Sequence, residues 1–293
     1  MLPWLTAAFS FFLACSVNGL DAVLNDTCAG QADINQVACM IQKLDIKLGS
    51  QSSKLDKVIQ LLQGGGQSSC KEIFEKGSMR ENKAYLLNVE SEKIPVYCHM
   101  ERTTQLEACG GGGWTLVMKI DGKKRTFHYD ANLWTNKKDH NPSAGKILFD
   151  HQETKLPTYW STPFSKICLA MKIGHQVNSI MIKKQADSLY SLIADGNHRS
   201  TSLGRHTWKK LIGQQASLQR NCNQEGFNCK SYSKARIGII SNGEKNCDTC
   251  DSRIGFGAGG YPDGDDNTCG NWARHGGDNG DRDIKAMGYI LVQ

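Results

Sequence analysis

Residues 97–122 read YCHMERTTQLEACGGGGWTLVMKIDG, and this stretch is the most informative part of the sequence about the fold. Residues 96–100 and 114–120 are apolar runs with β-branched and aromatic side chains, so each predicts a strand. Four consecutive glycines at 110–113 lie between them, where the backbone turns tightly or packs against another backbone with no side chain in between. The stretch therefore predicts two strands of a sheet joined through a glycine-rich turn.

The chain length and the first residues indicate a secreted protein. At 293 residues, one large or two ordinary domains are expected. The apolar run at 2–15 is followed by the small residues Val17 and Gly19, which predicts a signal peptide over residues 1–19. An uncleaved anchor is the alternative, but the run is shorter than the ~20 residues that a bilayer requires. We expect an extracellular protein without a membrane span.

Cysteine content and charge narrow the class of protein further. One of the twelve cysteines, Cys15, lies in the predicted leader, so an odd number remains. An oxidising compartment then implies a disulfide framework with one thiol left for pairing between chains. The net charge is +6, which we read as a solvated surface. No stretch resembles a nucleic-acid-binding motif, so we expect no nucleic-acid partner.

Residues 34–63 carry a heptad repeat that predicts a coiled coil. A single amphipathic helix packed on its own domain is the alternative, but we favour a homo-oligomer. Mixed Ile and Leu at the core positions leave a dimer and a trimer open. The a positions are Ile34, Ile41, Leu48, Leu55 and Leu62, and the d positions are Val37, Leu44, Gln51 and Val58.

An N-terminal arm, residues 20–33, precedes the predicted coiled coil. It carries Cys28 and the glycosylation acceptor Asn25, which opens the sequence Asn-Asp-Thr. Cys39 falls at an f position, away from the seam between helices, so it cannot bridge symmetrically through the core. An interchain disulfide from Cys39 to Cys28, or from Cys28 to Cys28, fits this arrangement.

A flexible linker, GGGQSS at residues 64–69, leads into a globular domain over residues 70–293. Within the domain, residues 202–218 predict a helix with an apolar stripe, and residues 167–173 and 236–240 predict strands. Frequent glycines and short strands indicate an α+β domain that is rich in loops.

The last fifty residues contain the candidate metal ligands. Asp263, Asp265 and Asn267 form a D-x-D-x-N run of short oxygen-bearing side chains, which suits a hard cation such as Ca²⁺. The run is not an EF-hand, because its sixth position is Thr268 and its twelfth is Arg274. The alternative is an Asp/Asn/Gly turn that binds nothing.

The chain shows no motif of an enzyme. G-x-S-x-G, H-E-x-x-H and P-loop sequences are absent. Cys247 and Cys250 have the spacing of a redox dithiol, and together with Cys222 and Cys229 they also resemble a set of four zinc ligands. In a secreted chain, structural disulfides are favoured over both. We therefore expect a non-enzymatic protein.

Both ends of the globular domain resemble fibrinogen-related domains, the module of fibrinogen, ficolins and intelectins. The amino-terminal block is SCKEIFEKG at 69–77 with the stretch at 97–122, and the carboxy-terminal blocks are RIGFGAGGYPDGDDNTCGN at 253–271 and GDRDIKAMGYILV at 280–292. The chain also resembles secreted fibrinogen-like proteins of cnidarians, a group that includes proteins of the coral skeletal organic matrix. The resemblance implies a fibrinogen C-terminal-like fold and a bridge between Cys70 and Cys98, which would contribute roughly 3.5 kcal/mol in the chain-entropy model.

The resemblance also implies calcium sites, one of which lets vicinal hydroxyls of a glycan ligate the metal. By position, Trp272 and His275 fall at the aromatic wall of the ligand pocket. The family's Glu-His pair is replaced here by Ser252 and Arg253. The candidate calcium ligands are Asp263, Asp265, Asn267, Asn242, Glu244 and Asn271.

Two functions agree with these features. The first is a secreted, oligomeric, lectin-like module that recognises extracellular glycans with the support of calcium. The second is a structural component of an extracellular or skeletal organic matrix, in which calcium only holds loops. Both predict a homo-oligomer joined by the coiled coil and by interchain disulfides.

Overall fold

The computed structural model describes residues 41–42, 44–49, 51, 66–77, 80–261 and 267–293. The chain forms two compact units, residues 1–65 and residues 66–293. Among the described residues, no helix is long and apolar enough to cross a membrane. The predicted signal peptide and Asn25, Cys28 and Cys39 lie outside the described residues.

The described residues of the first unit fall within the predicted coiled coil. Residues 41–42, 44–49 and 51 are helical. The heptad side chains Ile41, Leu44 and Leu48 are all exposed, Ile41 by 54% and Leu48 by 67%. An apolar stripe exposed to water on a helix is typical of a surface that a partner covers, so the coiled coil stays a prediction.

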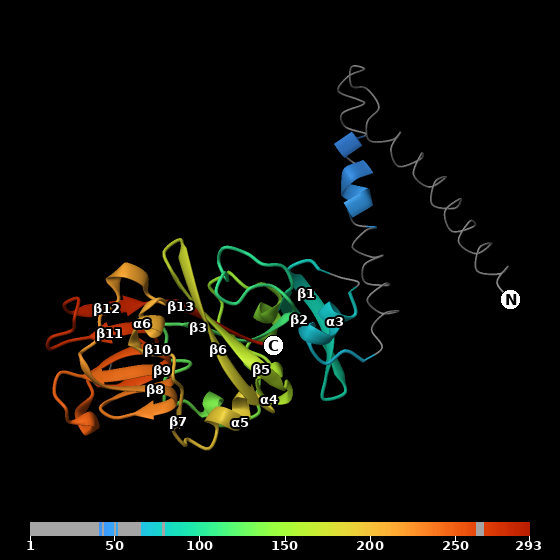
Figure 1. The fold of residues 1–293 in the computed structure, drawn as a ribbon. Coiled ribbons are helices and arrows are strands. Elements are labelled where there is room, and N and C mark those ends of the chain that lie inside the picture. The colour runs from blue at the N-terminus through green and yellow to red at the C-terminus, as the bar shows by residue number, and fades with distance from the viewer. Residues whose placement is uncertain (1–40, 43, 50, 52–65, 78–79, 262–266) are drawn as a thin grey trace, which may run out of the picture. The chain divides into compact units, whose positions relative to one another are not determined.

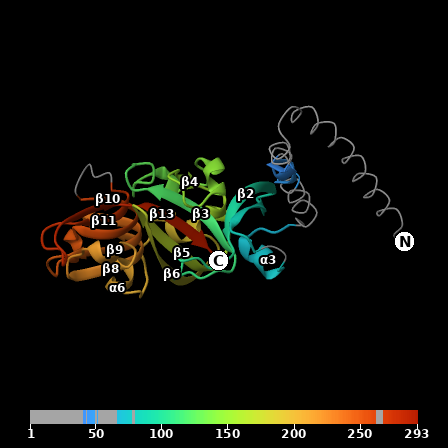
Figure 2. The same cartoon turned by 90° about the horizontal axis from the view of Figure 1, so that it is seen from above.

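The second unit contains two antiparallel sheets (Figures 1 and 2). The seven-stranded sheet has the order β1-β2-β3-β13-β5-β6, with β4 paired to β3, and the six-stranded sheet has the order β12-β11-β10-β9-β8-β7. The strands of the first are β1 Lys83–Val89, β2 Glu92–His99, β3 Trp114–Asp121, β4 Thr154–Lys155, β5 Phe164–Ile173, β6 Gln176–Ala186 and β13 Met287–Val292. The strands of the second are β7 Arg199–Ser200, β8 Asn221–Lys230, β9 Ser233–Asn242, β10 Ser252–Gly260, β11 Cys269–Ala273 and β12 Arg282–Lys285.

The described helices of the second unit are all short. They are α3 Cys70–Glu75, α4 Thr158–Ser161, α5 Leu189–Ile193 and α6 Arg205–Lys209, with 3₁₀ turns η1 Asn132–Trp134, η2 Pro142–Lys146, η3 Gly213–Gln215 and η4 Cys247–Thr249. The domain is therefore mixed but mostly β. The strands predicted at 96–100, 114–120, 167–173 and 236–240 are confirmed by β2, β3, β5 and β9, although β2, β5 and β9 begin three or four residues earlier than predicted.

The helix predicted over 202–218 is wrong in its extent, because only α6 and η3 form there. Gly213 has φ +82°, which interrupts a right-handed helix. Farther on, Ser217 and Leu218 donate their backbone N–H groups to the side chains of Asn271 and Asp278. Tertiary hydrogen bonds therefore replace the helical ones that the apolar stripe predicts.

The glycine-rich stretch joins β2 and β3 as predicted. In the antiparallel pair, Cys98 lies opposite Thr115. Gly113 has φ +85°, and a Cβ there would lie 2.6 Å from the carbonyl oxygen of Cys70, so no other residue fits. The Cys70–Cys98 disulfide is confirmed.

Strand β13 lies at the centre of the seven-stranded sheet, between β3 and β5. Its side chains alternate between the two main clusters of the core, since Ile290 and Val292 belong to one and Tyr289 and Leu291 to the other. The first cluster also contains Ile237 of β9, which joins the two sheets through one core. Each fully buried aliphatic side chain of this kind contributes about 1.5–3 kcal/mol.

Strands β9 and β10 bend back on themselves, which places their two halves face to face. A Cβ placed on Gly238 would lie only 3.1 Å from the Cβ of Ala235, and a Cβ placed on Gly255 would lie 3.0 Å from the same atom. Residues three apart in an extended strand are separated by about 10 Å, so β9 is sharply bent between residues 235 and 238. We call β9 and β10 together the folded hairpin.

His99, at the end of β2, makes the fold sensitive to acid. Its side chain is 1% exposed, and both ring nitrogens lack a hydrogen-bond partner among the described residues. Burial lowers its pKa to about 4. The unfolded chain, in which His titrates near 6.5, takes up a proton first, so stability falls from about pH 6.5 to pH 4, by roughly 3 kcal/mol in all, and levels off below.

We expect His99→Leu to remove most of this loss. The check is the free energy of unfolding by urea at pH 7 and at pH 4.5, compared between the variant and the unchanged protein. An equal fall in both would show that other groups cause the acid sensitivity.

Candidate ligand-binding face on the second sheet

Arg253 of β10 holds together the segments around the predicted metal ligands. The side chain is 1% exposed. Its guanidinium donates to Ser233 Oγ at 3.2 Å, to the carbonyl oxygen of Tyr261 at 2.5 Å and to that of Asn267 at 3.4 Å. The folded hairpin brings these groups together, since β9 supplies Ser233 and β10 supplies Arg253. Arg253 thus bonds the residues on either side of residues 262–266.

Asn267 and Asn271, two of the predicted calcium ligands, hydrogen-bond within the protein. Asn267 Nδ2 donates to Asp283 Oδ1 at 2.9 Å and to the carbonyl oxygen of Asn271 at 3.2 Å. Asn271 Oδ1 accepts from the N–H of Ser217, and its Nδ2 donates to the carbonyls of Ser217 and Arg253, all at 2.8–2.9 Å. Both side chains are buried, so each satisfies backbone groups that water does not reach.

The other predicted ligands lie elsewhere or outside the described residues. Asn242, at the end of β9, donates from Nδ2 to Thr249 Oγ1 at 2.9 Å and accepts at Oδ1 from the N–H of Gly243. Glu244 is exposed on the following turn. Asp263 and Asp265 lie outside the described residues.

The described part of the predicted set does not fit a calcium site by itself. Calcium takes oxygen ligands, six to eight of them, and the amides of Asn267, Asn271 and Asn242 are already engaged. The carbonyls of Tyr261 and Asn267 accept from a guanidinium, whose positive charge disfavours a second cation beside it. Calcium therefore stays a prediction that rests on Asp263 and Asp265.

Of the predicted aromatic wall, His275 lies beside Tyr261, and Trp272 is connected to Tyr261 through Arg253, whose guanidinium lies over the Trp272 ring and donates to the carbonyl oxygen of Tyr261. Tyr261 Oη is 3.1 Å from His275 Nε2, and the two rings are tilted with centroids 6.3 Å apart. Both side chains are exposed. Trp272 is mostly buried, and two guanidinium groups lie near its ring, that of Arg274 at 5.1 Å and that of Arg253 at 6.0 Å from the ring centroid. We call Tyr261, Trp272, Arg274 and His275 the aromatic face.

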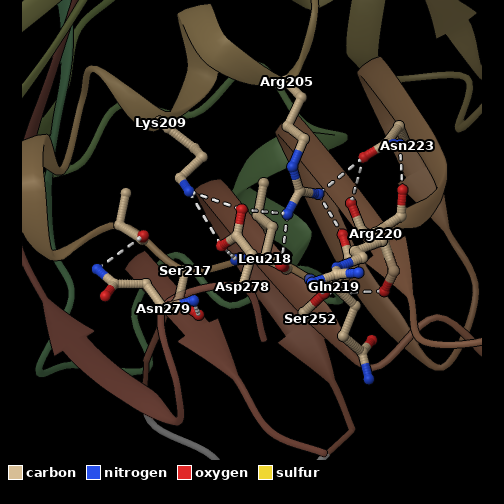
Figure 3. Close-up of polar contacts among 12 residues, drawn as sticks. Arg205, Lys209, Ser217, Leu218, Gln219, Arg220, Asn223, Ser252, Asp278 and Asn279 are labelled. Atoms are coloured by element: carbon tan, nitrogen blue, oxygen red, sulfur yellow. Dashed lines mark hydrogen bonds and ion pairs between the residues drawn. The ribbon is translucent and has the colours of Figure 1, made fainter. Parts of the chain in front are cut away.

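A network around Asp278 fixes the loop next to the aromatic face (Figure 3). Arg205 Nη2 and Lys209 Nζ, both from α6, each donate to Asp278 Oδ2 at 2.8 Å. The N–H of Leu218 donates to Asp278 Oδ1. Burial alone would raise the pKa of Asp278, but these bonds lower it to about 2, so the carboxylate stays charged. The network ties α6 to the loop over residues 274–281.

A surface cavity of about 730 Å³ borders this network. Its lining mixes polar and apolar surface, and its polar residues include His206, Lys209, Lys210, Gln214, Asp278 and Asn279. Lys209 is paired with Asp278 there, so two of the lining charges cancel.

Sequence patterns did not reveal Arg205, Lys209 or Asp278 as partners. Arg205 and Asp278 are 73 residues apart, and neither stands in a recognisable motif. The sequence offered one signal, which is charge: residues 205–209 carry two basic side chains, and residues 274–281 carry two aspartates.

Glu225 of β8, a half-buried carboxylate, stabilises the fold. It accepts from Trp208 Nε1 at 2.7 Å, Thr201 Oγ1 at 2.8 Å and the N–H groups of Leu203 and Gly204 at 3.0 Å. Burial raises its pKa, but these four bonds outweigh burial, and the net shift is downward. A carboxylate with its oxygens so engaged is poorly placed to act as a base.

No family model matches this sequence, and no curated protein is significantly similar to it.

Proposed function

We propose that the chain is a secreted, oligomeric, non-enzymatic module that recognises extracellular glycans through the aromatic face. The observation that carries this proposal is the placement of exposed Tyr261 against exposed His275, with the Trp272–Arg274 pair connected to Tyr261 through Arg253. Aromatic rings offer an apolar surface with a polar edge, and His, Arg and Tyr supply hydrogen-bond donors and acceptors for hydroxyls. This combination suits a sugar.

The framework of the second unit supports an extracellular location. Disulfides join Cys70 to Cys98, Cys109 to Cys168 and Cys222 to Cys247. Such bonds persist in oxidising environments and are rare in the cytosol. The apolar run at residues 2–15 supports entry into the secretory pathway.

The exposed heptad residues Ile41, Leu44 and Leu48 support an oligomer. Joining several weak sites raises overall affinity without new contacts. A calcium role is proposed on sequence alone, with Asp263 and Asp265 as the first ligands.

We expect the purified full-length protein to bind a subset of sugars on a glycan array. Tyr261→Ala and His275→Ala should each weaken that binding by about tenfold, equivalent to ~1.4 kcal/mol, because each removes one side of the pair. His175→Ala, which changes an exposed histidine on another strand connection, is the matched control and should bind as the unchanged protein does.

The array repeated with a chelator tests the calcium role separately. Binding that disappears would assign calcium to the sugar site, and binding that persists would place recognition on side chains alone. If no sugar binds at any calcium concentration, the glycan proposal is wrong, and the structural role in an extracellular matrix takes its place.

A further inference from the structure

The described part of the second unit holds three disulfides and three free cysteines. The free ones are Cys229, Cys250 and Cys269, and all are buried. A pair of thiols buried together in a protein that passes through an oxidising compartment is a candidate for a further disulfide. Of the three free cysteines, only Cys229 and Cys250 belong to the same buried cluster.

Cys229 of β8 and Cys250, which precedes β10, share one small core with two residues of the folded hairpin. This cluster consists of Cys229, Ala235, Ile240 and Cys250, with Cys222 packed against it. Both free thiols are 0% exposed. Cys222 belongs to the Cys222–Cys247 disulfide, so the cluster lies directly beside an existing bridge.

Backbone contacts fix both residues beside the same turn. Cys229 lies opposite Ala235 in the β8–β9 pair, and the turn between these strands begins after Lys230. Cys250 donates its N–H to Ser231 Oγ at 2.8 Å, and its carbonyl accepts from the N–H of Ser233 at 2.6 Å. Two bonds therefore hold Cys250 against residues two and four positions from Cys229.

Cys269 lies in a different environment. It belongs to the main core cluster, which contains no other described cysteine. A Cβ on Gly288 of β13 would lie 2.5 Å from its Sγ, so strand β13 covers it. Cys269 therefore has no thiol within its own cluster to pair with.

We propose that Cys229 and Cys250 form a fourth disulfide in the secreted protein, parallel to Cys222–Cys247, and that Cys269 is the thiol left over. The oxidant is a small or protein disulfide of the secretory pathway, such as glutathione disulfide. One cysteine thiolate attacks the oxidant's S–S bond and releases one thiol. The second thiolate then attacks the resulting mixed disulfide and releases the other thiol. Two electrons and two protons pass from the cysteine pair to the oxidant.

The bond forms before the hairpin closes. Thiolate, and not thiol, is the attacking species. Burial in the finished fold raises the pKa of both Cys229 and Cys250, which keeps them protonated and unreactive. Oxidation during folding avoids this barrier, and the closed hairpin then shields the bond from reduction.

A Cys229–Cys250 disulfide gives the Cys247-x-x-Cys250 motif a structural role in place of a redox role. Each of its two cysteines bonds to a different cysteine of β8, so the motif clamps β8 to the segment before β10 at two points. A redox dithiol would instead pair Cys247 with Cys250.

Disulfide mapping of the full-length protein, secreted from a eukaryotic host, tests the proposal. Free thiols are first blocked with N-ethylmaleimide in denaturant. Trypsin then releases residues 221–230 and 246–253, each with two cysteines. A second digestion that cleaves after Glu225 separates Cys222 from Cys229. Cleavage before Asp248 and Asp251 then separates Cys247, in residues 246–247, from Cys250, in residues 248–250.

We expect residues 226–230 to be linked to residues 248–250, and residues 221–225 to residues 246–247. The peptide that contains Cys269 should carry maleimide. Maleimide on Cys229 and Cys250 would overturn the proposal, as would pairing of Cys222 with Cys229 or of Cys247 with Cys250.

A substitution gives a second, independent readout. In Cys250→Ser, Cys229 should change from unlabelled to fully labelled by maleimide while Cys222–Cys247 persists. Cys269→Ser is the matched control, and it should leave Cys229 unlabelled. Labelling of Cys229 in the unchanged protein decides against the bond even if Cys250→Ser is not secreted.

Discussion

Gly270→Ala is expected to lower the free energy of unfolding by about 4 kcal/mol, because β11 has no room for a methyl group at this position. Gly270 has φ +141°, a conformation that residues with a Cβ rarely adopt. A Cβ there would also overlap the carbonyl oxygen of Ile284 on the neighbouring strand β12. Relief requires β11 to move away from β12, which breaks the pairing of the two strands.

Gly174→Ala is the matched control for this change. Gly174 also has a positive φ, +58°, but a Cβ there meets nothing within 4 Å. Its cost should therefore be only the ~1 kcal/mol of an unfavourable backbone conformation. Urea unfolding of the two variants separates the effects. Equal costs for both would show that β11 and β12 yield easily and that the overlap has little weight.

Arg253→Met is expected to lower the free energy of unfolding by about 3 kcal/mol. Methionine fills a similar volume but donates no hydrogen bond, so the carbonyls of Tyr261 and Asn267 lose their buried donor. Hydrogen bonds to a charged group contribute more than neutral ones, and an unsatisfied buried acceptor adds a desolvation cost. The same change should weaken glycan binding, because Tyr261 is then less firmly placed opposite His275.

Arg274→Met separates the loss of stability in Arg253→Met from the loss of a positive charge. Arg274 lies over the same tryptophan, Trp272, but its side chain is 46% exposed. We expect it to cost less than 1 kcal/mol in stability. If the two variants unfold at the same urea concentration, then Arg253 does not hold the hairpin and the flanking segments together as inferred.

The strands of the fold were predictable because their signal is local. The apolar runs at 96–100 and 114–120 carry β-branched and aromatic residues, and the glycines between them permit the turn that the structure contains. The helix predicted at 202–218 failed for the opposite reason. Its apolar stripe is real, but Ser217 and Leu218 hydrogen-bond to residues more than 50 positions away.

The candidate site was only partly predictable, because one residue type serves two purposes. Asn267 and Asn271 were chosen as oxygen ligands, yet the same amides hydrogen-bond to backbone groups in the structure. Spacing along the chain does not distinguish a ligand from an internal hydrogen-bond partner. Arg253 was noticed only as a departure from the family pattern, and its contacts with Ser233 and Tyr261 depend on the bend of the hairpin.

The central position of β13 has a consequence for how the protein is synthesised. Because residues 287–292 fill the gap between β3 and β5, a growing chain cannot complete the seven-stranded sheet until these residues have left the ribosome. Until then the facing edges of β3 and β5 are unpaired and open to pairing with other chains. A translation product that stops before Met287 therefore leaves the facing edges of β3 and β5 without their shared partner strand.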